Sequence, residues 1–254
     1  MLHSLTTRIE PKFYFSPSRD LGSGEPKDPI GPIREVVCQF GHCIELGTYY
    51  NAAETLGKSP PVTPAILAKA IEDHDPYVRR FAVLVLSTNT EKAIQVMPQL
   101  INALKDRDKS IRLYLSQIFE KIETAVPILI SALSDNDRDI RSGALDVIGK
   151  ICTIGEIENG LIPHLIKALD DKELDVRKAA ATCIERINRS TISSFSTLRR
   201  ICDDREDMKG YYRFISEQMK TAIPTLNKAQ GDTNLDVCEA VRQAIESFEL
   251  YNNL

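Results

Sequence analysis

Cys38, His42 and Cys43 are residue types that bind zinc, and they lie close together in the chain. Cys38 and His42 are separated by one helical turn, so they would share a helix face. A structural zinc site needs four ligands, and no second Cys or His pair follows at zinc-finger spacing. We therefore expect no metal here, and interpret the thiols as core side chains beside a surface histidine.

Other familiar motifs are incomplete. The segment Asp135–Asp139 begins like a calcium loop, but Ile140 stands where the loop needs Gly and Asp146 where it needs Glu. Gly22–Ser23–Gly24 lacks the spacing of a phosphate-binding loop. Neither a nucleophile elbow nor the kinase motifs occur. The sequence thus predicts a non-enzymatic protein with no catalytic residue and no cofactor.

Four arginines each follow a Val or Ile at one point of a recurring pattern, and they are Arg79, Arg112, Arg141 and Arg177. Guanidinium groups pair with carboxylates or bind other anions. We favour a structural ladder, in which each arginine pairs with an aspartate of its own or a neighbouring turn. The alternative is an anion-binding stripe for a phosphoprotein or a nucleic-acid backbone.

The pattern around these arginines is an internal repeat. Fourteen positions separate Pro98 from Arg112, and the same interval follows Pro127 and Pro163. Pro64 begins an earlier copy with one extra residue, and Pro224 begins a later copy that has Cys238 in place of Arg. Such self-similarity is typical of repeat proteins.

Each repeat reads as two helices joined by a turn. The proline suits the first turn of helix A, and the Asp-rich segment can end helix A and cap helix B. Apolar residues follow Arg112, Arg141, Arg177 and, in the last copy, Cys238 at helical spacing. They are Leu115, Phe119 and Ile122; Ala144, Ile148 and Ile151; Ala180, Ile184 and Ile187; and Val241, Ile245 and Phe248. The predicted fold is all-α, a right-handed α-solenoid of stacked helix pairs with about six to seven repeats.

The Pro–Leu–Ile–Ala–Leu pattern, the Asp-x-Asp turn and the Val/Ile–Arg dipeptide resemble the HEAT-repeat family, in the short form found in phycobilisome lyase subunits. This resemblance implies an armadillo-type fold in which these positions are structural. It also implies an alternative function, as a bilin lyase subunit or a chaperone-like helper of chromophore attachment.

The departures from the repeat suggest the domain organisation. Residues 1–32 are rich in Pro and Gly and are expected to form an extended or partly disordered arm, and residues 33–254 the solenoid. We divide the solenoid into an N-terminal cap (33–60), regular repeats (61–187), an irregular repeat (188–220) and a C-terminal repeat (221–254). In the irregular repeat, Tyr211, Tyr212 and Arg213 are candidate partner-binding residues, although its aromatic side chains could instead be core.

Composition narrows the class of partner. The net charge of −4 and the sequence pI of about 5.7 disfavour a nucleic-acid binder, and the absence of Trp disfavours an alkylated-DNA glycosylase. No long apolar segment suggests a membrane span, and the cysteines suit a reducing compartment. We expect a cytoplasmic scaffold or adaptor that binds another protein or peptide, with its oligomeric state left open.

Overall fold

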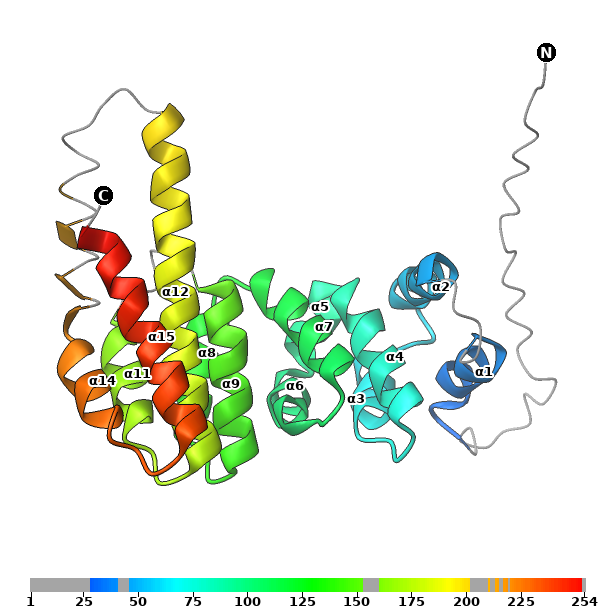
Figure 1. Cartoon of the computed structure of the whole chain (residues 1–254). Coiled ribbons are helices and arrows are strands. Elements are labelled where there is room, and N and C mark those ends of the chain that lie inside the picture. The colour runs from blue at the N-terminus through cyan, green and yellow to red at the C-terminus, as the bar shows by residue number, and fades with distance from the viewer. Residues whose placement is uncertain are drawn as a thin grey trace, which may run out of the picture.

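The structure is a computed structural model that describes residues 28–40, 46–152, 160–201, 210, 213, 214, 217, 218 and 220–252. All regular secondary structure in these residues is helical, which confirms the all-α prediction. The helices stack side by side along the molecule (Figure 1). None of the helices within the described ranges is long and apolar enough to cross a membrane.

The repeats contribute A and B helices in alternation. The A helices are α3 (Pro64–Ile71), α6 (Met97–Asn102) continued by the 3-10 turn η1 (Ala103–Lys105), α8 (Ala125–Ala132), α11 (Leu161–Leu169) and α14 (Ile223–Ala229). The B helices are α4 (Pro76–Ser87), α7 (Lys109–Glu120), α9 (Arg138–Ile151), α12 (Leu174–Ile201) and α15 (Leu235–Asn252). Two helices, α1 (Gly31–Phe40) and α2 (Leu46–Lys58), precede them, and a short α5 (Thr90–Gln95) lies between α4 and α6.

The B helices begin where the Asp-rich turns supply caps. The carboxylates of Asp75, Asp108 and Asp137 accept hydrogen bonds at 2.8–2.9 Å from backbone N–H groups in the first turns of α4, α7 and α9. These bonds satisfy donors that have no partner inside a helix. In the A helices the recurring prolines lie in the first turn, as at Pro64 in α3.

The inner faces of the B helices form one continuous core. The predicted apolar positions are buried in each repeat, for example Leu115 and Phe119 in α7 and Ala180 and Ile184 in α12. Each B helix packs against the next, and α12 contacts both α9 and α15 (Figure 1). The fold is therefore an α-solenoid of stacked helix pairs.

The structure differs from the predicted organisation at two boundaries. Helix α12 continues from Leu174 to Ile201, so no helix ends near residue 187, where we placed the start of an irregular repeat. The reason is that this segment contains neither Gly nor Pro, and the polar Asn188 and Thr191 are buried along its course. Helix α1 also begins at Gly31, before the predicted cap boundary.

Candidate partner-binding groove

The Asp-rich turns share one hydrogen-bonding pattern. In each, the first aspartate accepts the backbone N–H two residues later at 2.8–2.9 Å. These aspartates are Asp73, Asp106, Asp135, Asp171 and Asp232. This contact is local, so it leaves the second carboxylate oxygen available to a neighbouring repeat.

The arginine of each B helix fastens its own turn. Nη1 of Arg79, Arg112, Arg141 and Arg177 donates to the backbone carbonyl of the aspartate six positions earlier, at 2.6–3.1 Å. In the last repeat the thiol of Cys238 donates to the Asp232 carbonyl at 3.2 Å. The bond explains why a donor recurs at this position of the repeat.

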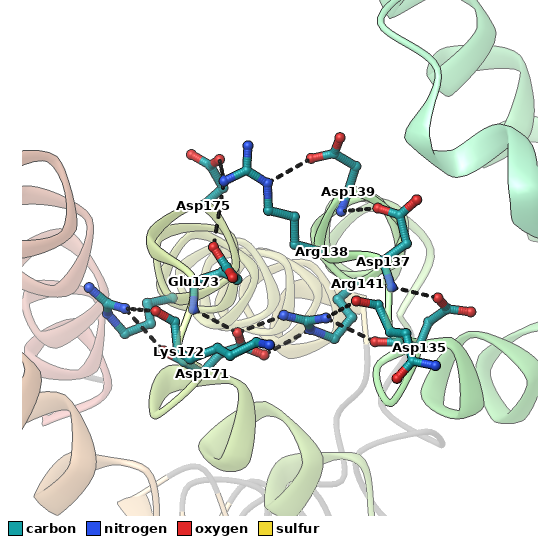
Figure 2. Close-up of polar contacts among 11 residues, drawn as sticks. Asp135, Asp137, Arg138, Asp139, Arg141, Asp171, Lys172, Glu173 and Asp175 are labelled. Carbon is teal, nitrogen blue, oxygen red and sulfur yellow. Dashed lines mark hydrogen bonds and ion pairs between the residues drawn. The ribbon is translucent and has the colours of Figure 1, made fainter.

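Three of the arginines also join one repeat to the next. Nε and Nη2 of Arg141 donate to both carboxylate oxygens of Asp171, at 2.9 and 2.8 Å. Arg79 donates in the same way to Asp106, and Arg177 to Asp232. Figure 2 shows Arg141 between Asp171 and the Asp135 turn. We call each such pair a rung; its forked geometry fixes neighbouring turns relative to each other.

The rungs change the acidity of their carboxyls. Burial alone would raise the pKa of Asp171, but the bonds from Arg141 and from the Glu173 backbone N–H lower it below the ordinary value. The hydrogen bond from Arg177 lowers the pKa of Asp232. The pKa of the Arg141 guanidinium is raised by its hydrogen bond to Asp171.

These shifts predict acid sensitivity. A carboxyl whose pKa is lowered in the folded state stabilises it above the ordinary pKa and loses that effect as pH falls through the folded pKa. We expect the free energy of unfolding to decline as pH falls below about 4. In urea titrations followed by circular dichroism, Asp171→Asn should show a shallower decline, whereas the exposed control Glu123→Gln should follow the wild type. A profile that Asp171→Asn leaves unchanged would contradict this assignment.

Arg112 departs from the rung pattern. Its equivalent partner would be Asp135, yet the structure gives no ion pair between them, and Arg112 donates only to the Asp106 carbonyl, at 2.6 Å. Among the four ladder arginines, all of which lie in the described ranges, it alone lacks a carboxylate partner. The ladder is therefore interrupted between α7 and α9.

The backbones also pack closely here, at the joint where α9 meets η1. Gly143 of α9 lies directly against η1, and a Cβ atom at this position would be 2.4 Å from the Leu104 carbonyl oxygen. No side chain fits at that distance without a backbone shift. Gly143 thus allows α9 to contact the end of the preceding A helix.

A groove of about 580 Å³ opens at the same joint and crosses the B helices of three successive repeats. Its lining includes Arg112 from α7, Ser142 and Gly143 from α9, and Ala179 and Thr182 from α12. These four small residues lie among charged ones, and each helix presents one face to the groove. The charged lining residues are Arg138, Asp139 and Asp146 in α9 and Asp175, Lys178 and Arg186 in α12.

The carboxylates that line the groove are held in ion pairs. Arg138 lies 3.6 Å from Asp139 and 3.9 Å from Asp175, and Figure 2 shows it reaching both. Arg186 pairs with Asp146 at 2.6 Å, and Asp106 takes part in the rung with Arg79. For Asp146, burial would raise the pKa, but hydrogen bonds from Arg186 and Lys150 lower it.

The comparisons with known proteins agree with the repeat. Residues 97–182 match the family model described as HEAT repeats. The matched HEAT segment includes the interrupted rung and much of the groove. A search of the curated proteins found no match. The finer resemblance to phycobilisome lyase repeats stays a prediction.

Solved structures resemble the chain at low identity. Computationally designed armadillo repeat proteins for modular peptide recognition are 18% identical, with 85% of this chain and 98% of that chain covered and a TM-score of 0.41. AlkD2 from Streptococcus mutans is 15% identical, with 72% and 97% covered and a TM-score of 0.49. Crescerin, described as using a TOG domain array to regulate microtubules, is 16% identical, with 84% and 88% covered and a TM-score of 0.48.

The sequence-predicted contact residues lie away from this groove or outside the described ranges. Tyr211 and Tyr212 are not among the described residues, while Arg213 is exposed and does not line the groove. Their role in partner binding stays a prediction. Cys38 is exposed, so its interpretation as a core thiol is wrong. His42 and Cys43 lie outside the described ranges, and no metal-binding group occurs within those ranges.

Sequence reasoning missed the groove itself. Its small lining residues, Ser142, Gly143, Ala179 and Thr182, have no motif of their own. One signal was available in the spacing of the arginines. Arg112 and Arg141 are 29 positions apart, against 33 between Arg79 and Arg112 and 36 between Arg141 and Arg177. The shortest interval, from Arg112 to Arg141, is therefore the one in which the rung is missing.

Proposed function

We propose that this protein is a non-enzymatic scaffold that binds an extended segment of a partner protein in the groove across α7, α9 and α12. The observation that supports the proposal is the groove itself, which crosses three B helices and is lined in α9 and α12 by small residues set among charged ones. Extended surfaces formed by stacked repeats are suited to long, linear partners.

The chemistry of the groove favours binding over catalysis. Its titratable groups are Arg, Lys and Asp, and the Asp side chains are paired with cations in the described structure. A general acid or base needs a group that is free to exchange a proton with a substrate. The paired aspartates are held instead as structural anions.

Selection from a displayed random-peptide library tests the proposed function. We expect the wild-type protein to enrich peptides that Ala179→Trp no longer binds, because an indole on α12 would fill the groove. The matched control is Lys167→Trp, which places the same side chain on the exposed side of α11. We expect this control to bind as the wild type does.

Affinities of the enriched peptides should fall about tenfold or more in Ala179→Trp, which corresponds to about 1.4 kcal/mol of binding free energy. Equal binding to Ala179→Trp and to the wild type would exclude the groove as the site. Failure to enrich any peptide would count against the scaffold itself.

A further inference from the structure

We infer that the groove recognises an acidic segment of the partner, and that a partner carboxylate takes the place of the missing rung at Arg112. This inference rests on the proposed function and deepens it, because it states the chemistry of the bound segment. It follows from comparing Arg112 with the other ladder arginines and from the charges that line the groove.

The side-chain donors of Arg112 differ from those of the other ladder arginines in the bonds they make. In Arg79, Arg141 and Arg177, Nη1 bonds to the arginine's own turn, and Nε and Nη2 form a fork on an aspartate of the next turn. Arg112 keeps the first contact but lacks the second in the described structure. Its Nε and Nη2 have no carboxylate partner among the described residues, and Arg112 lines the groove, where a carboxylate of a partner could complete the fork.

Most of the other cations that line the groove are paired with carboxylates. Lys105 lies 3.5 Å from Asp137, and Lys178 lies 2.9 Å from Asp236. Arg138 and Arg186 pair with lining aspartates, as described above. Arg107 is exposed, and the described residues provide it with no ion pair. Arg107 and Arg112 are thus the lining cations without a carboxylate partner in this part of the chain.

The balance of charge in the groove is therefore positive. Each lining aspartate has a cationic partner, while two lining arginines have none. An arginine that faces a groove and has no partner gains more from a ligand carboxylate than a paired one does, because no existing contact has to break. The chain as a whole carries a net charge of −4, so the attraction must come from this local site.

The arrangement favours a peptide carboxylate over a nucleic-acid backbone. A nucleic acid presents closely spaced phosphates along its length, and its affinity depends on many neutralising contacts. Here four lining aspartates lie among the arginines and would repel successive phosphates. A peptide can place one or two acidic side chains at the arginines and neutral residues beside the aspartates.

The test is fluorescence anisotropy with a labelled peptide of alternating Glu and Ser, long enough to cross two repeats. The full chain is titrated against this peptide and against matched peptides in which Gln or Lys replaces Glu. We expect the Glu peptide to bind more tightly than either matched peptide. Arg112→Gln should weaken binding of the Glu peptide about tenfold or more. The exposed control Lys167→Gln should leave it unchanged.

Arg107→Gln provides a second variant, because Arg107 is exposed and its replacement should not disturb folding. We expect it to weaken binding of the Glu peptide by a smaller factor than Arg112→Gln does. Three results would overturn the inference: equal binding of the Gln peptide, wild-type affinity in Arg112→Gln, or tighter binding of a single-stranded oligonucleotide that also depends on Arg112. If the peptides selected from the library lose binding in Ala179→Trp but are not acidic, the inference fails and the proposed function stands.

Discussion

Replacement of Arg141 by Gln is expected to lower the free energy of unfolding by about 3 kcal/mol, because it breaks a buried ion pair from one side. Only 7% of the Arg141 side chain is exposed, and 15% of that of Asp171. Without the guanidinium, the Asp171 carboxylate keeps its bond from the Glu173 backbone but loses both contacts across the repeat boundary. The measurement is urea unfolding followed by circular dichroism.

The matched control for Arg141→Gln is Arg112→Gln. Both substitutions remove a bond to the turn's first carbonyl, and Arg141 also donates to the Asn136 carbonyl at 3.2 Å, so the difference between them measures the rung together with that weaker bond. We expect Arg112→Gln to cost about 1 kcal/mol or less, as for one partly exposed hydrogen bond. Equal losses in the two variants would show that the ion pair to Asp171 adds nothing to the stability of the stack.

Gly143→Ala is expected to destabilise the joint by about 2 kcal/mol, in the range found when a well-packed site is overfilled. Two effects oppose each other here. Alanine improves helix propensity by about 1 kcal/mol over glycine. The added Cβ, however, would lie 2.4 Å from the Leu104 carbonyl oxygen, and a backbone atom cannot move aside as a flexible side chain can. The steric effect should therefore exceed the propensity gain.

Gly231→Ala is the control for this substitution, since its Cβ would lie 3.6 Å from the Lys228 carbonyl oxygen, at ordinary contact distance. We expect its free energy of unfolding to stay near the wild-type value. Thermal and urea unfolding of both variants provide the measurement. A Gly143→Ala protein as stable as the wild type would show that α9 and η1 can separate without cost.

The repeat could be predicted from the sequence because its marks act locally. A proline in the first turn, an aspartate at the cap and apolar residues at helical spacing each affect a few neighbouring residues, and they place the A and B helices correctly. The extension of α12 beyond Ile187 was missed because the 61-residue interval between Pro163 and Pro224, about twice the others, indicates an extra repeat. With no Gly or Pro to end the helix, the chain continued it.

The groove could not be predicted because it depends on how repeats are placed relative to each other. Arg79 and Arg112 look alike in sequence, since each follows an apolar residue and an Asp-rich turn. Whether their forked donors reach a carboxylate is decided by the distance between successive turns in three dimensions. The short interval between Arg112 and Arg141 indicates where the ladder is interrupted, but it does not predict how far the Arg112 side chain lies from the next turn.

The most direct test of the account is the urea midpoint of the wild type, Arg141→Gln and Arg112→Gln, each with and without the peptide of alternating Glu and Ser. A ligand that binds only the folded state raises the midpoint. We predict that Arg141→Gln has a lower urea midpoint than the wild type and that the peptide still raises this midpoint. Arg112→Gln should have a midpoint near that of the wild type, and the peptide should leave it unchanged. If the peptide raised the urea midpoint equally in Arg112→Gln and in the wild type, the claim that the peptide binds at Arg112, where the rung is missing, would be contradicted.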